Sequence, residues 1–232
     1  MPKLDAYQRL IRARELAQAG KHAEALREHV WFHQHALDEI PSLSGVRLSF
    51  ALFDWINLSK AYPPALKKLK SIRDNTTRKL FGRHASFALF HDISSINGYL
   101  DEVSATYQAF RRLDAEYPAL AKSCADVAMD AIVAAKDFEL ARRYWPSPEA
   151  ELLEASEWFN ADVIRHHKMP PTAAPRLDAF VSIYCNRVLT MMRIAEGLGH
   201  VETAGSIKEW AVALVDDRRA RRRAAAKLEA GK

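Results

Sequence analysis

A pentapeptide that occurs twice constrains the fold of this chain more than any other feature of its sequence. Ser49–Phe53 reads Ser-Phe-Ala-Leu-Phe, and Ser86–Phe90 repeats it with an offset of 37 residues. Tyr62 has its counterpart in Tyr99 with the same offset. Internal similarity with a period of roughly 20 to 50 residues is typical of solenoids, in which each repeat buries its apolar face against the next.

The repeat extends to four copies when its frame is carried outward, and each copy is expected to be a helix, a tight break and a second helix. The aromatic position falls on His22, Tyr62, Tyr99 and Phe138, with spacings of 40, 37 and 39 residues. Three residues later stand Ala25, Ala65, Glu102 and Ala141, so one copy departs from a small residue there. From the glycines and prolines, breaks are predicted at Gly20–Lys21, Ala61–Pro63, Asn97–Gly98 and Lys136–Asp137. Second helices are predicted to end near Ile40–Pro41, Asn75, Tyr117–Pro118 and Trp145–Pro146.

The composition favours helices over strands in every copy. The 8 glycines and 10 prolines fall at intervals and leave long stretches rich in Ala, Leu, Glu, Arg and Lys. Hydrophobic residues make up 49% and charged residues 27%, which is ordinary for a folded chain and unlike a disordered one. Because no stretch alternates β-branched or aromatic residues with polar ones between turn signals, we expect an all-α fold.

The segment Ala19–Leu26, which reads Ala-Gly-Lys-His-Ala-Glu-Ala-Leu, resembles the signature of the tetratricopeptide family. That family is built from helical pairs of about 34 residues with a small-aromatic-small pattern. The resemblance covers residues 4–145 and implies a superhelical solenoid of four antiparallel hairpins. The units of this chain are a few residues longer, and the opening aromatic of the family pattern is missing. Arg9, Ser49, Ser86 and Ala125 stand at that place.

Beyond Pro146 the periodicity weakens, and a capping bundle of helices is expected over residues 146–232. Residues 148–167 read as one amphipathic helix, and residues 176–196 and 201–227 read as a last helical pair with Gly199 at its turn. The apolar face predicted for the first of these helices consists of Leu152, Leu153, Trp158, Phe159 and Ile164. Since a solenoid must end on a polar face, we interpret residues 1–232 as a single all-helical domain.

The resemblance also implies where a ligand would bind, because the first helix of each tetratricopeptide pair lines the concave side. Projected onto this frame, the predicted partner-binding positions are Arg14, Arg47, Phe50, Asp54, Asn57, His84, Phe87, His91, Asp126 and Asp130. Aromatic anchors combined with Arg and Asp are usual in protein interfaces. For Phe50 and Phe87 we favour packing between neighbouring helices, because apolar residues at helical spacing belong to the core more often than to an interface.

Two histidine groupings raise the question of metal chemistry. His29 and His33 lie one helical turn apart, a spacing that can share a metal, but no third ligand is indicated, so exposed or interface histidines are favoured. The doublet His91-Asp92 resembles the metal-binding doublet of the all-helical HD phosphohydrolases. A metal-dependent phosphohydrolase centred on this doublet is therefore the alternative function. A downstream carboxylate for it would come from Asp126, Asp130 or Asp162.

The formal charge of +5 is concentrated at the C-terminus. Residues 216–232 hold seven basic and three acidic side chains, a charge of +4, so the rest of the chain carries about +1. We interpret this end as a solvated, fraying helix rather than a nucleic-acid site, because it lacks interleaved aromatics.

Residues 1–10 contain no apolar core of a signal peptide, and Cys124 and Cys185 stand singly, so a cytoplasmic protein without a membrane partner is expected.

These observations favour binding over catalysis. The sequence lacks a Ser-His-Asp grouping, a glycine-rich phosphate loop and a cysteine-pair zinc signature. We therefore expect no catalytic residue, metal, cofactor or small-molecule substrate. The expected function is a protein–protein interaction module for one dedicated partner. The residues leave open whether it is an immunity-type inhibitor of a toxin or an adaptor.

Overall fold

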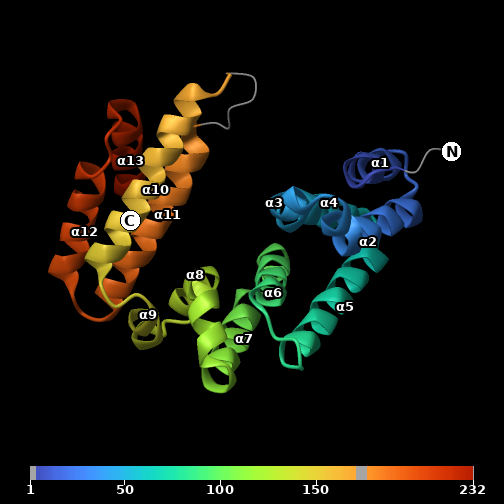
Figure 1. Cartoon of the computed structure of the whole chain (residues 1–232), viewed down its shortest axis with the longest axis horizontal. Coiled ribbons are helices and arrows are strands. Elements are labelled where there is room, and N and C mark those ends of the chain that lie inside the picture. Colours follow the sequence, from blue (N-terminus) through green and yellow to red (C-terminus); the bar gives the residue numbers. More distant parts are fainter. Residues whose placement is uncertain (1–3, 171–176, 232) are drawn as a thin grey trace. The chain divides into compact units, whose positions relative to one another are not determined.

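The computed structural model describes residues 4–170 and 177–231, and throughout these residues every regular element is a helix (Figure 1). The prediction of an all-α fold is therefore confirmed. The chain divides into two compact units, Met1–Ala128 and Met129–Lys232, and the division falls within α8. None of the described helices combines the length and apolarity that crossing a bilayer requires.

The first unit is a succession of helices in which sequence neighbours pack against each other. α1 packs against α2, α4 against α5, and α6 against α7, while α4 also contacts α1, α2 and α6. The elements are α1 (Ala6–Gln18), α2 (His22–Glu39), the 3-10 turn η1 (Pro41–Leu43), α3 (Ser44–Leu48), α4 (Phe50–Ala61), α5 (Pro63–Leu80), α6 (Phe87–Tyr99), α7 (Val103–Glu116) and α8 (Pro118–Ala134).

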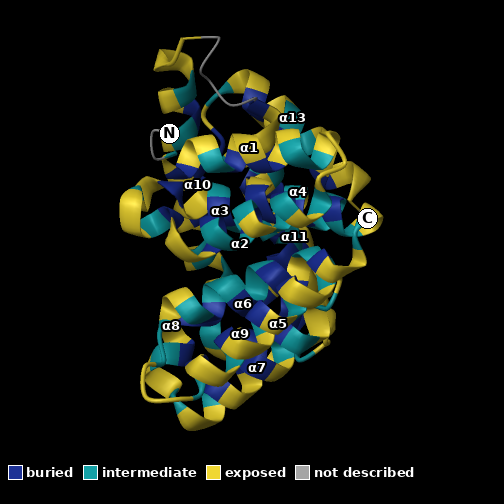
Figure 2. Cartoon of the chain, turned by 90° about the vertical axis from the view of Figure 1, so that its right-hand side faces the viewer, coloured by how far each residue is buried: buried dark blue, intermediate teal, exposed yellow. Residues whose placement is uncertain are grey.

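The second unit is organised around α11, which packs against α9, α10, α12 and α13. Its helices after α8 are α9 (Phe138–Tyr144), α10 (Pro148–Lys168), α11 (Leu177–Gly197), α12 (Val201–Ala213) and α13 (Arg218–Ala230). In both units the helices are striped, with a buried face and an exposed face (Figure 2). That striping is the structural counterpart of the amphipathic periodicity in the sequence.

Most predicted helix boundaries are confirmed, and four differ. One of the four is the helix predicted over residues 201–227, which is broken at residues 214–217 into α12 and α13. The breaks near Gly20, Tyr62 and Lys136 lie where they were predicted, whereas the third break falls at residues 100–102, after α6 has run on to Tyr99. α5 continues to Leu80, beyond the predicted end at Asn75. The short helix α3 was not predicted and separates Arg47 from the helix that begins at Phe50.

Four of the helical hairpins are joined by the same turn. In each, one residue adopts a left-handed backbone conformation two positions before the next helix begins. These residues are Gly20 (φ 73°), Asp101 (φ 59°), Lys136 (φ 58°) and Gly199 (φ 82°). The following amide closes the turn by donating to a carbonyl five residues earlier, as Lys21 does to Leu16 at 2.9 Å and His200 does to Ala195 at 2.8 Å. This is the Schellman helix ending, and its recurrence shows that the same local geometry is used in both units.

The recurring turn explains why the third copy departs from the small-residue pattern. Five residues after the left-handed position, every one of these hairpins has a small, buried side chain that lets the two helices approach closely. These side chains are Ala25, Thr106, Ala141 and Ala204. The sequence frame puts Glu102 at this position because it places Tyr99 at the start of a second helix, whereas Tyr99 ends α6. The equivalent residue is Thr106.

The two identical pentapeptides begin helices at the same point but bury different faces. Phe50 and Phe87 are each the first residue of a helix, and both are exposed. Phe53 is 54% exposed, whereas its counterpart Phe90 is fully buried. The residues that follow explain the difference. In α4 the buried face contains Trp55, whereas in α6 the equivalent residue is the charged Asp92 and the buried face contains Ile93.

Within the described residues, two hydrophobic clusters join α1 to α6 in the first unit. The larger contains Leu52, Trp55 and Leu58 of α4 with buried side chains of α2, α5 and α6. The smaller joins α1, α2, α3 and α4 around Leu10 and Phe32. Because α4 contributes to both clusters, it is the central helix of this unit.

The C-terminal residues form a docked helix, so the prediction of a fraying tail is wrong. Asp217 caps α13 by accepting a hydrogen bond from the Ala220 amide at 2.7 Å. Ala220, Ala224 and Leu228 are buried, and α13 packs against α11. The arginines therefore occupy the outer side of a folded helix. A helix was predicted here, but its docking was not, because its buried face is made almost entirely of alanine, which gives a weak hydrophobic signal.

The apolar face predicted for α10 is only partly correct. Leu152 and Phe159 are buried, but Leu153, Trp158 and Ile164 are exposed. Val163 completes the buried stripe instead. Residue 176, where the next helix was predicted to begin, lies outside the described residues, and α11 is described from Leu177.

Candidate protein-binding surface

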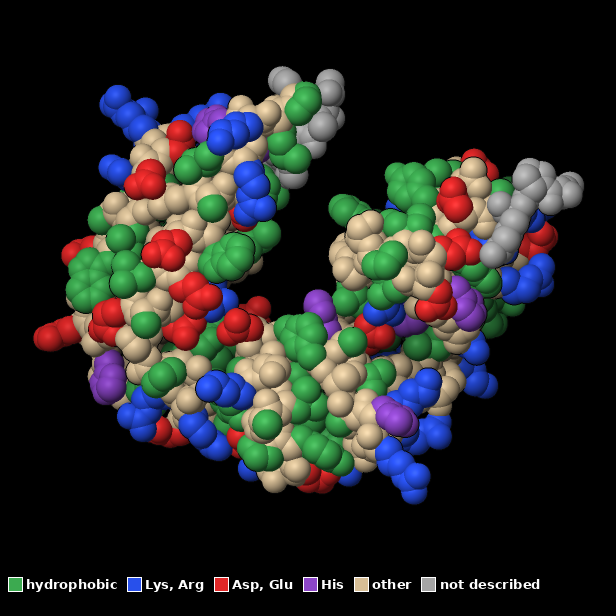
Figure 3. Space-filling view, in the orientation of Figure 1, with side chains coloured by type: hydrophobic (Ala, Val, Ile, Leu, Met, Phe, Trp, Pro, Cys, Tyr) green, Lys and Arg blue, Asp and Glu red, His purple; other side chains and the backbone are tan. Residues whose placement is uncertain are grey.

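Exposed hydrophobic side chains gather on α1, α4 and α6, each the first helix of a hairpin. Because α4 packs against both α1 and α6, the three helices are neighbours, and hydrophobic side chains are visible over α4 and α6 in Figure 3. Exposed fractions run from 40% for Ile11 to 64% for Phe50. We name as the first-helix surface Tyr7, Ile11, Phe50, Phe53 and Phe87. Clustered apolar exposure of this kind is typical of sites that bind other proteins.

For Phe50 and Phe87 the favoured interpretation from sequence, packing between helices, is wrong. Both side chains are exposed because each stands at the first position of its helix, before the buried stripe begins. Phe87 contacts the ring of His91 one turn later, with ring centroids 5.4 Å apart. Burial of the half-exposed His91 ring lowers its pKa, an effect that the charge of Asp92 opposes and that of Arg47 reinforces.

An ion pair joins α1 to α4 beside these side chains. Arg14 Nε donates to Asp54 Oδ2 at 2.6 Å. Ile11 lies one turn before Arg14, and Phe50 lies one turn before Asp54, so the pair holds the apolar face of α1 next to that of α4. The Arg14 side chain is well exposed, and such surface pairs contribute at most about 1 kcal/mol. The Arg14 side chain can therefore rearrange around a bound protein at little cost.

The structure buries Arg47 and does not expose it on the first-helix surface. Its guanidinium binds both carboxylate oxygens of Asp92 on α6, and its Nη1 also donates to the carbonyl oxygen of His33 at 3.3 Å. Arg47 is only 7% exposed. Breaking a buried pair of this kind costs several kcal/mol. Arg47 therefore fastens α3 to α6 and α2 and is not presented to a ligand.

The remaining predicted positions do not form one cluster. Asn57 is half-buried on α4 and accepts a hydrogen bond from Lys60 at 2.9 Å. His84 is exposed in the turn before α6 rather than on the helix. Asp126 is an exposed residue of α8 in the first unit. Asp130 belongs to the second unit, where it accepts a hydrogen bond from Thr190 at 3.0 Å.

His29 and His33 are core residues, which corrects the interpretation that they are exposed or at an interface. Their rings flank the buried Trp55, with centroid distances of 5.6 and 6.1 Å. Burial lowers the pKa of each imidazole to about 4. Trp55 is itself held by its indole N–H, which donates to the Ala65 carbonyl at 2.9 Å. A neutral histidine pair packed on an indole ring is a structural arrangement, and its sequence spacing alone could not distinguish it from a metal site.

The arrangement around His91 and Asp92 does not resemble a metal centre. Both Asp92 oxygens are engaged by the Arg47 guanidinium, which neutralises the carboxylate. Within residues 4–170 and 177–231 no three His, Cys, Asp or Glu side chains converge as a metal site needs. No observation in the described structure therefore favours the phosphohydrolase alternative.

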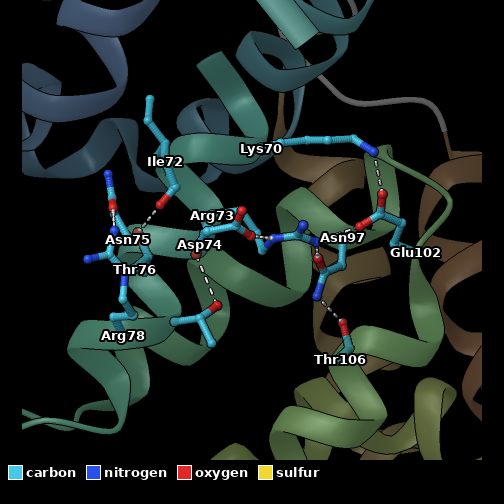
Figure 4. A network of polar contacts seen from close by, with 11 residues as sticks. Lys70, Ile72, Arg73, Asp74, Asn75, Thr76, Arg78, Asn97, Glu102 and Thr106 are labelled. Carbon is cyan, nitrogen blue, oxygen red and sulfur yellow. Dashed lines mark hydrogen bonds and ion pairs between the residues drawn. The ribbon is translucent and has the colours of Figure 1, made fainter. Parts of the chain in front are cut away.

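Sequence reasoning missed a polar network that joins α5, α6 and α7 (Figure 4). Glu102 accepts from Lys70 Nζ at 2.7 Å and from Arg73 Nη1 at 2.6 Å, and these hydrogen bonds lower the pKa of its carboxyl group. Arg73 Nη1 also donates to the buried Asn97 at 2.7 Å, and Asn97 donates to Thr106 at 3.1 Å. No local signal indicated it, because its hydrogen bonds join residues up to 32 positions apart.

Three comparisons with known proteins identified no relative of this chain. A scan against protein-family models, a search of curated proteins and a search of solved structures each found no match.

Proposed function

We propose that this protein binds another protein through the first-helix surface of a tetratricopeptide-like arrangement of hairpins. The observation that carries the proposal is the exposure of Tyr7, Ile11, Phe50, Phe53 and Phe87 on three neighbouring helices. Aromatic side chains in this setting act as anchors because each removes a large apolar area from water when a partner covers it.

The recurring Schellman turn supports the tetratricopeptide-like part of the proposal. The same helix ending, followed by a small buried side chain five residues on, occurs in four hairpins. A solenoid repeats one local structure with variable surface residues. Its first helices then carry the specificity, while Ala25, Ala141 and Ala204 maintain the spacing between paired helices.

The proposal is tested by recovering the partner and then perturbing the surface. Wild-type protein with an affinity tag is used to isolate a stoichiometric partner from the native cell. Phe50→Asp combined with Phe53→Asp is expected to abolish its recovery. The matched control is Leu153→Asp combined with Trp158→Asp, which changes two equally exposed apolar residues of α10. Circular dichroism verifies that both variants are folded.

Titration of the purified partner then gives the magnitude. Phe87→Ala is expected to weaken binding by at least about 10-fold, the usual effect of truncating an interface anchor. Equal affinity of wild type and the double Asp variant would refute the proposal. If the partner is an enzyme that loses activity in the complex, the protein is an inhibitor. A partner that stays active and recruits a third protein identifies an adaptor.

A further inference from the structure

A groove between α2 and α5 lies apart from the first-helix surface in the same unit. Its volume is about 630 Å³, in the range of sites that accommodate several side chains. One wall is a stripe of α2 and the other is a stripe of α5. The lining residues are Ala23, Leu26, Arg27, Val30, Trp31, Gln34 and His35 on α2, and Pro64, Lys67, Lys68 and Ser71 on α5.

The floor of the groove is apolar and continuous with the core. Leu26 and Val30 are half-buried and pack against the cluster that contains Trp55 and Leu69. The α2 stripe covers about 13 residues, so the groove runs for roughly 20 Å along that helix. This length matches roughly four turns of a second helix.

The walls of the groove are basic, and no acidic residue lines it. Arg27, Lys67 and Lys68 are exposed and form no ion pair within the part of the chain that the structure describes. α5 carries six basic residues and one acidic residue, although the chain outside residues 216–232 has a charge of only about +1. Figure 3 shows Lys and Arg side chains gathered over α5. Positive charge is therefore concentrated at this helix.

A second hollow extends the basic surface along α5. It shares Lys67 and Ser71 with the groove and adds Lys70 and Arg78. The acidic residue in it, Asp74, is paired with Arg73 at 2.5 Å. The neighbouring hollow consequently presents the same sign of charge as the groove.

We infer that the α2/α5 groove binds an acidic amphipathic segment of another protein. Apolar side chains of the segment fill the floor at Leu26 and Val30, and its carboxylates meet Arg27, Lys67 and Lys68. Helix-in-groove recognition uses this combination of apolar anchors and rim charges. The inference goes beyond the proposed function because it concerns a different surface and does not depend on Phe50 or Phe53.

Nucleic acid fits the groove less well than an acidic peptide does. Single-stranded nucleic acid is held by bases stacked on open aromatic faces. Trp31 is the large aromatic side chain that lines the groove. One face of its ring is already covered by the Arg9 guanidinium, which lies 4.1 Å from the ring centroid. His35 lies against the same indole, with ring centroids 5.5 Å apart. The floor of the groove presents the aliphatic side chains Leu26 and Val30, and these do not bind the phosphates and sugars of a nucleic acid.

The test uses a fluorescein-labelled peptide of about 16 residues, roughly four helical turns. Leu is placed at positions i, i+3, i+4 and i+7, and the other positions are Glu and Ala. Fluorescence anisotropy is expected to show saturable binding to the full chain. A peptide with Lys in place of Glu, and another with Ser in place of Leu, are each expected to bind at least about 10-fold more weakly.

Variants of the protein locate the binding. Lys67→Glu with Lys68→Glu is expected to weaken binding at least about 10-fold by charge reversal. Ser71→Trp, which fills the groove without a change in charge, is expected to do the same. The control Lys60→Glu with Lys122→Glu changes the net charge equally at exposed sites outside the groove and is expected to bind like wild type.

Three outcomes would overturn the inference. One is equal binding by wild type and Ser71→Trp, and another is equal binding of the Leu and Ser peptides. The third is a single-stranded oligonucleotide that binds more tightly than the acidic peptide and loses affinity with Lys67→Glu and Lys68→Glu. The Phe50→Asp and Phe53→Asp variant is expected to bind the peptide normally, so failure of the proposed function would not be mistaken for failure of this inference.

Discussion

Acidification is expected to destabilise the first unit through two buried histidines. His29 and His33 flank Trp55 and have pKa values lowered from 6.5 to about 4, chiefly by burial. The unfolded chain binds protons on both residues at a higher pH than the folded chain does. The free energy of unfolding is therefore unaffected by these groups above pH 6.5 and falls as the pH drops from 6.5 towards 4. Below pH 4 the destabilisation by both groups has reached its full size.

The magnitude follows from the two pKa values. At pH 5 the unfolded histidine is almost fully protonated and the folded one is mostly neutral, which costs about 2 kcal/mol per histidine relative to pH 7.5. For both residues the loss is about 4 kcal/mol, a large part of the total stability of a typical domain. Asp54 and Arg14 lie near His29 and act in opposite directions, as do Asp92 and Arg47 near His33.

Urea unfolding followed by circular dichroism at pH 7.5 and pH 5.0 measures this loss. His29→Gln is expected to reduce the difference between the two pH values by about 2 kcal/mol, and adding His33→Gln by about 4 kcal/mol. His35→Gln is the control, because His35 is exposed. Carboxylates elsewhere contribute equally to every variant and cancel. A pH dependence that is the same in wild type and in the double Gln variant would refute the reasoning.

Three further perturbations test the packing. Arg47→Met is expected to lower the free energy of unfolding by about 3 kcal/mol because it leaves Asp92 unpaired, and adding Asp92→Leu is expected to restore most of it in a urea titration. Burial raises the pKa of the Cys124 and Cys185 thiols to about 11, so both are expected to react with a thiol reagent only after unfolding, and rapid native-state labelling would contradict this. Deletion of residues 217–232 removes the buried face of α13 and is expected to lower the midpoint of thermal unfolding, whereas an unchanged midpoint would mean that this helix is not docked.

Local signals in the sequence determined the helices and most of their ends. Gly20 and Gly199 mark turns because glycine adopts the left-handed conformation without strain, and Pro63 and Pro148 mark helix starts because proline suits the first turn. These effects act within a few residues, so they are readable from sequence. The buried Ala25 followed from its position after such a turn.

Tertiary packing decided which face of each helix is buried and which polar groups meet. The identical pentapeptides show this, since Phe53 is exposed and Phe90 is buried in helices that begin alike. The pairing of Arg47 with Asp92 joins residues 45 positions apart, and nothing local indicates it. The candidate site depends on the same long-range information. Phe50 and Phe87 were predicted as binding positions from sequence, whereas the exposure of Phe53 was not, because burial is a property of the surroundings of a side chain.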